Sequence, residues 1–115
     1  MCGLIQGMPY VTFKNLDRTK VAQIADLTIN KLVEASGAPK EAFRIYEGGT
    51  LVASGDGADS VLVEVKMYPR PADQMVKMAQ ALHDAVNTVE PAEVHVIFSN
   101  ISGFEYHYKN GHQYR

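Results

Sequence analysis

The sequence predicts an α/β fold in which two βαβ units form one four-stranded mixed sheet, with two helices on one face and a C-terminal hairpin. Two stretches have the apolar period of an amphipathic helix, and a short strand-like run stands before and after each of them. The two halves, about residues 9–46 and 61–98, also align with each other, so that Val11 matches Val63 and Pro39 matches Pro91. Right-handed crossovers would place both helices on the same face of the sheet.

The first half begins with a strand-like run over residues 10–14. Asp17 is a suitable N-cap for the helix that follows, and Gly37 with Pro39 marks its end. Residues 42–46 are rich in aromatic and β-branched side chains and predict a second short strand. The apolar stripe of this helix comprises Val21, Ile24, Ala25, Leu32 and Val33.

The second half is preceded by a Gly-, Ser- and Asp-rich loop over residues 47–60, in which residues 50–52 predict a brief strand. Residues 61–67 are the most strand-like run of the chain, and residues 94–98 form the last strand of the sheet. The helix between them starts after Pro71 and has Met75, Met78, Ala79, Leu82 and Val86 on one face. Further on, Asn110-Gly111 is a strong signal for a tight hairpin turn.

Alternation along the four strands leaves a mixed set of side chains on the face away from the helices. We interpret this face as a subunit interface, and the alternative is an ordinary solvated sheet face. The set comprises Tyr10, Thr12, Lys14, Arg44, Tyr46, Leu62, Glu64, Lys66, His95 and Ile97.

Composition excludes several classes of protein. The net charge of -2 provides no basic surface for nucleic acid or an anionic membrane, and no apolar run approaches the ~20 residues of a membrane span. Cys2 is the only cysteine, which excludes a disulfide framework and a cysteine-based zinc site. The four histidines lack metal-ligand spacing. We therefore expect a cytoplasmic protein without metal or cofactor.

The dipeptide Met8-Pro9 stands directly before the first strand-like run. The preceding residues, MCGLIQG, show neither helix nor strand period, and we interpret residues 1–7 as an extension from an upstream start or from cloning. Met8 is then the true initiator, and residues 8–115 form the domain. Removal of Met8 gives Pro9 a free secondary amine, which takes and returns a proton near neutral pH. Without that processing, Pro9 merely opens an edge strand.

Two stretches resemble the tautomerase superfamily, which includes 4-oxalocrotonate tautomerase and macrophage migration inhibitory factor, and are most similar to an uncharacterised bacterial branch of it. Met8-Pro9 before a strand is similar to the processed N-terminal proline of that superfamily. The segment GAPKEAFRI, residues 37–45, resembles a turn in which an Ala-Pro pair precedes a strand with a central arginine. Counted from Pro9, the resemblance covers essentially the whole domain.

The resemblance implies an isomerase, a keto–enol tautomerase that forms a homotrimer and acts on a 2-oxo acid or a related small carboxylate. It assigns the proton transfer to Pro9 and the binding of the substrate carboxylate to Arg44, since an arginine fork matches a carboxylate. Arg18 and Tyr46 are further candidates for substrate binding. For Arg44 the alternative is an interface ion pair, for example with Glu64. The alternatives for Arg18 and Tyr46 are a helix-surface arginine and a core aromatic.

Ala38 stands where migration inhibitory factor has a lysine, so the identity of the substrate stays open. Two other functions stay open as well. One is a catalytically silent member of the same fold that binds a small ligand or acts as a scaffold. The other is a ferredoxin-like binding domain with the same order of elements, although the loop over 47–60 is long for its central hairpin.

Overall fold

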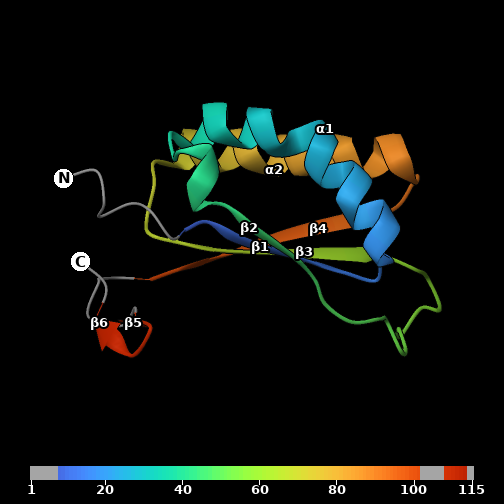
Figure 1. Cartoon of the computed structure of the whole chain (residues 1–115). Coiled ribbons are helices and arrows are strands. Elements are labelled where there is room, and N and C mark those ends of the chain that lie inside the picture. The colour runs from blue at the N-terminus through green and yellow to red at the C-terminus, as the bar shows by residue number, and fades with distance from the viewer. Residues whose placement is uncertain (1–7, 102–107, 114–115) are drawn as a thin grey trace.

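Two helices lie side by side on one face of a four-stranded sheet in the computed structural model, which describes residues 8–101 and 108–113 (Figure 1). The helices are α1 (Arg18–Ser36) and α2 (Ala72–Val89). The strands are β1 (Tyr10–Lys14), β2 (Arg44–Glu47), β3 (Val61–Met67) and β4 (Val94–Asn100), and their order in the sheet is β2-β1-β3-β4. Neither helix is long and apolar enough to span a bilayer in this described part.

The sheet is mixed because each half of the chain makes one parallel pair. β1 runs parallel to β2 and β3 runs parallel to β4, with one helix in each crossover. The two halves meet in the centre, where β1 and β3 are antiparallel and Thr12 faces Glu64. This arrangement confirms the predicted fold class.

The ends of α1 follow the predicted capping residues. The Asp17 side chain accepts a hydrogen bond from the Lys20 backbone N–H at 2.9 Å. At the other end Gly37 adopts a left-handed conformation with φ 76°, and its N–H donates to the Val33 carbonyl at 2.9 Å. Glycine adopts such a positive φ at little cost, which is why it ends helices.

The strand predicted over residues 42–46 begins later, at Arg44. Lys40–Ala42 instead form a short 3₁₀ turn, η2, in which the Ala42 N–H donates to the Pro39 carbonyl at 3.0 Å. Pro39 fixes its own φ and thereby favours a tight turn at this point. The prediction of strand residues 42 and 43 was therefore wrong, whereas the position of Arg44 in the strand is confirmed.

The brief strand predicted over residues 50–52 does not form in the described loop. The loop is anchored by Asn15, whose backbone N–H donates to the Gly49 carbonyl at 2.7 Å. The Asn15 side chain accepts from the Leu51 N–H at 3.2 Å, and it donates to Asp59 at 2.7 Å and to the Ser60 carbonyl at 2.8 Å. One residue, at φ 72°, thus holds both ends of the loop without strand pairing.

The predicted hairpin is confirmed by strands β5 (Tyr108–Lys109) and β6 (His112–Gln113). Asn110 and Gly111 occupy the turn with φ values of 54° and 82°. Two consecutive positive values are typical of the type I′ turn that Asn-Gly favours. The hairpin lies beyond the end of the sheet at which β1 begins, on the side away from the helices (Figure 1).

The hydrophobic core fills the layer between the sheet and the helix pair. Both central strands contribute side chains with no exposed surface, as the alternation predicts. The fully buried side chains of the strands and helices include Val11, Phe13, Val63, Val65, Ile24, Leu32, Met78, Leu82 and Val86.

The two helices offer a matched test of this core. Leu82 is 0% exposed and Leu27 is 49% exposed. We expect Leu82→Ala to lower the free energy of unfolding by about 2–5 kcal/mol, since it removes buried methyl groups and leaves a cavity. Leu27→Ala should cost about 0.5 kcal/mol. Urea unfolding followed by circular dichroism measures both, and equal losses would contradict the assignment of the core face.

Candidate functional site

Pro9 lies at the start of β1, buried at the end of the sheet. Its side chain is less than 2% exposed, and Met8 before it is 3% exposed. The Pro9 carbonyl accepts a hydrogen bond from the Arg44 N–H at 3.3 Å, so β2 begins directly beside it. The structure therefore brings two of the predicted site residues, Pro9 and Arg44, next to each other through their backbones.

The surroundings of Pro9 follow from the strand register. Tyr10 faces Arg44 on one side and Lys66 on the other, so the neighbouring strands extend past Pro9 as Phe43 and as Met67. Met67 has no exposed surface, and Phe43 is 7% exposed. Both belong to the same core cluster as Met8. Pro9 thus opens β1 within an apolar end of the core.

Arg44 is exposed and points its guanidinium back onto its own turn. Nη1 donates to the Glu41 carbonyl at 2.8 Å and to the Phe43 carbonyl at 2.9 Å. Glu64, the alternative ion-pair partner of Arg44, forms an ion pair within the chain with Lys14 at 3.4 Å. Both acceptors are backbone carbonyls, and no carboxylate within the described residues forms an ion pair with Arg44, so its guanidinium can still pair with an anion.

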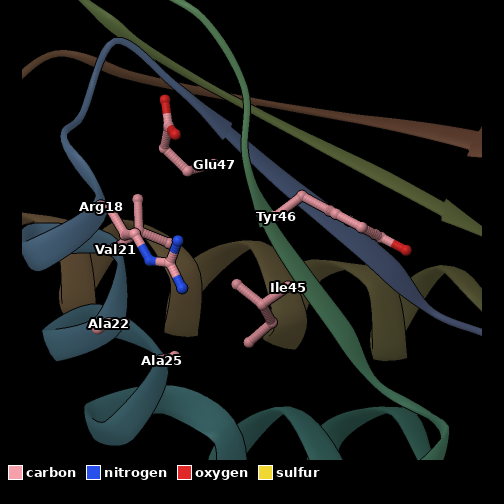
Figure 2. Close-up of a pocket in the computed structure, with 7 residues that line it drawn as sticks. All are labelled: Arg18, Val21, Ala22, Ala25, Ile45, Tyr46 and Glu47. Carbon is pink, nitrogen blue, oxygen red and sulfur yellow. The ribbon is translucent and has the colours of Figure 1, made fainter.

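Arg18 and Tyr46 line a hollow of about 350 Å³ between α1 and β2 (Figure 2). The Arg18 guanidinium extends into the space between the helix and the strand, whereas the Tyr46 ring points away from it (Figure 2). That ring meets Tyr10 edge to face, with ring centroids 6.4 Å apart. The Arg18 side chain has no ion pair or hydrogen bond within residues 8–101 and 108–113. The remaining lining residues are Val21, Ala22, Ala25, Ile45 and Glu47.

One chain does not assemble all four predicted residues. Pro9 precedes β1 and Arg18 follows it, so the strand separates them by about 16 Å at ~3.3 Å per residue. Arg44 lies at the Pro9 end of β2, and the hollow with Arg18 follows β2 from Ile45 to Glu47. Tyr46 stands between these two positions on β2.

Arg70 was missed as a site element by reasoning from sequence. Its Nε donates to the Ser36 carbonyl at 3.0 Å, and its Nη1 donates to the Tyr68 carbonyl at 3.2 Å. Burial lowers the pKa of Arg70 from its ordinary value. The residue ties the end of α1 to the segment after β3, at the same end of the sheet as Pro9. Its one signal in the sequence is its match to Arg18 when the halves are aligned.

A second hollow, of about 370 Å³, lies at the opposite end of the open sheet face, under the loop that Asn15 anchors. Its walls are mainly apolar and include Leu51, Leu62 and Ile97. His95 lines the same hollow, and its Nε2 lies 2.6 Å from a Glu93 carboxylate oxygen. No group of three or more His, Cys, Asp or Glu side chains within the described ranges is placed to hold a metal ion.

Comparison with known proteins identifies a family for nearly the whole chain. The model described as "Domain of unknown function (DUF1904)" matches residues 8–113. A solved structure of a DUF1904 domain from Sebaldella termitidis is similar, with 18% identity and a TM-score of 0.81 over 92% of this chain and 99% of that one. No curated protein matches this sequence.

Two further solved structures have the same fold. A fused 4-OT, described as a wild-type symmetric trimer, is 19% identical with a TM-score of 0.74, over 91% of this chain and 95% of that one. The protein Pt0534, described as inactivated by 2-oxo-3-pentynoate, is 19% identical with a TM-score of 0.75, over 91% of this chain and 96% of that one. The fold is tautomerase-like, and identities this low show the fold alone.

Proposed function

We propose that this chain, which belongs to the DUF1904 family, is a tautomerase-like enzyme that moves a proton between the keto and enol forms of a 2-oxo acid or related small carboxylate. Pro9 transfers the proton after removal of Met8. One observation carries the proposal. Pro9 opens β1 in an apolar end of the core beside Arg44, in the fold of fused 4-OT.

The chemistry follows from the two residues. A neutral secondary amine at Pro9 takes a proton from the carbon next to the ketone, and the electron pair moves to the carbonyl oxygen to form the enolate. The protonated amine then gives this proton to the enolate oxygen, which forms the enol and restores the neutral amine. Ketonisation runs through the same two transfers in reverse. Burial among apolar side chains favours the neutral form of an amine, which keeps it available as a base. Arg44 binds the substrate carboxylate and stabilises the developing negative charge.

The substrate class is supported by a protein of similar fold. Pt0534 is described as inactivated by 2-oxo-3-pentynoate, which is itself a 2-oxo acid. A compound of that class therefore acts on one protein of this fold. For this chain we infer the same class of ligand, with Pro9 as the reactive group.

We also propose that the active assembly is a homotrimer. Arg18 lies too far along the sheet to act on the Pro9 of its own chain, so a neighbouring copy supplies it, whereas Tyr46 contacts Tyr10 next to Pro9. The open sheet face supports association because it exposes Tyr46 at 49% and Ile97 at 54% beside charged residues. The similar fused 4-OT is described as a trimer.

A catalytically silent binding protein is the second candidate, and two observations favour it. Met8 is buried and packed in the core, so it is a structural residue while it is present. The Arg44 guanidinium is engaged by two backbone carbonyls, those of Glu41 and Phe43. The start of the mature chain distinguishes the two candidates.

Two starts of the chain should differ in activity. A chain that begins at Pro9 should ketonise phenylenolpyruvate or 2-hydroxymuconate about 10²–10⁴ times faster than residues 1–115, since only the shorter chain has the amine. Ultraviolet absorbance follows the loss of the enol, and intact mass confirms each start. Equal rates, or no activity in either chain across a panel of 2-oxo acids, would support the silent candidate.

The role of Arg44 can be tested in the chain that begins at Pro9. Arg44→Ala should raise KM for a carboxylate substrate and lower kcat, because it removes both the anchor and the stabilisation of the enolate. Arg44→Lys, which retains the charge without the planar fork, should be intermediate. Steady-state kinetics measure both variants. Unchanged kcat and KM in Arg44→Ala would remove Arg44 from the site.

The proposed homotrimer can be tested by its mass in solution. Light scattering should give three times the 12.7 kDa mass of one chain at micromolar concentration. Ile97→Asp should dissociate the trimer, since it places a charge in the proposed interface. Val76→Asp is the matched control, because Val76 is 66% exposed on α2, away from the sheet face. A monomeric wild-type chain would contradict the proposal.

A further inference from the structure

The Met8 side chain fills a space that begins at the Pro9 nitrogen. The carbonyl carbon of Met8 is bonded to that nitrogen, and the Cα that bears the side chain is two bonds away. Met8 is 3% exposed and belongs to the core cluster. Its removal therefore empties a buried apolar space directly beside the new amine.

With Met8 in place, no substrate reaches the Pro9 nitrogen, since Pro9 itself is less than 2% exposed. The proposed chemistry already requires the loss of Met8. The same cleavage thus supplies two things at once, a free amine and a space next to it.

The size of this space follows from the side chain that fills it and from the core cluster to which that side chain belongs. The neighbouring strands continue past Pro9 as Phe43 and as Met67 followed by Tyr68, and all three side chains are at least 93% buried. Interiors are closely packed, so the space has the dimensions of the side chain that fills it. A methionine side chain is unbranched, apolar and four heavy atoms long.

We propose that the space filled by Met8 is the subsite for the tail of the substrate, and that it selects 2-oxo acids with an unbranched apolar tail of about four heavy atoms. The proposal rests on the proposed function for the position of the oxo group at Pro9. The tail occupies the emptied space, and the carboxylate remains on the side of Arg44. The Met8 side chain then occupies the subsite until Met8 is removed.

The test compares ligands of one composition and different shape. Isothermal titration calorimetry measures the binding of 2-oxohexanoate, its isomer 3,3-dimethyl-2-oxobutanoate and pyruvate to the chain that begins at Pro9. Each buried methylene contributes about fourfold in affinity, so 2-oxohexanoate, with three more methylenes, should bind about 60 times more tightly than pyruvate. The branched isomer should lose most of this gain.

A second set of proteins separates the space from the amine. Residues 1–115 should not bind 2-oxohexanoate, because Met8 fills the subsite. The same chain with Met8→Ala should bind it and still fail to ketonise enols, since Pro9 remains an amide. Met78→Ala is the matched control, because Met78 is 0% exposed on α2 and leaves a similar void elsewhere in the core. This control should not bind.

The outcomes distinguish this inference from the proposed function. Ketonisation by the chain that begins at Pro9 without preference for the straight tail would overturn the subsite alone. Preference for the straight tail without ketonisation in that chain would support the subsite and overturn the enzyme. Equal binding by the Met8→Ala and Met78→Ala variants would also overturn the subsite. The chain that begins at Pro9 tests the same space if Met8→Ala fails to fold.

Discussion

The antiparallel pairing of β1 with β3 is the constraint on which the rest of the structure depends. It joins the two βαβ halves around the Thr12–Glu64 pair and turns both crossover helices to one face. The helix pair is then tied at both ends. Lys20 donates to Glu90 at one end, which raises the pKa of Lys20, and Arg70 donates to Ser36 at the other. The pairing also fixes the end of the sheet at which Pro9 is buried.

Much of this fold was predictable because its signals are local. A capping side chain at Asp17, a left-handed glycine at Gly37 and the Asn110-Gly111 turn each act over a few residues. Alternation along the strands likewise predicts the two faces of the sheet. The loop over residues 48–60 was less predictable, because the Asn15 side chain anchors it across a long stretch of sequence. No pattern within the loop itself carries that information.

The candidate site was only partly predictable for a related reason. The resemblance identifies residue types but not which of them share one end of a strand. The structure places Arg44 beside Pro9 and leaves Arg18 at the far end of β1, with its guanidinium in a separate hollow. Such a separation is expected when an active site is shared between copies of a chain. The mixed open face of the sheet is consistent with this, since Leu62 and Ile97 would together expose apolar surface to water if the face were solvated.

Met8 presents a conflict between packing and chemistry. A residue that is removed from a mature protein is expected to lie at the surface, where its loss costs little stability. Here the side chain is 3% exposed within the core cluster, so its loss leaves an apolar void that destabilises the chain. A ligand that refills the void recovers part of this free energy on binding. Under the proposed function, the stability lost at the start of β1 becomes binding energy next to the Pro9 amine, where it would orient the substrate.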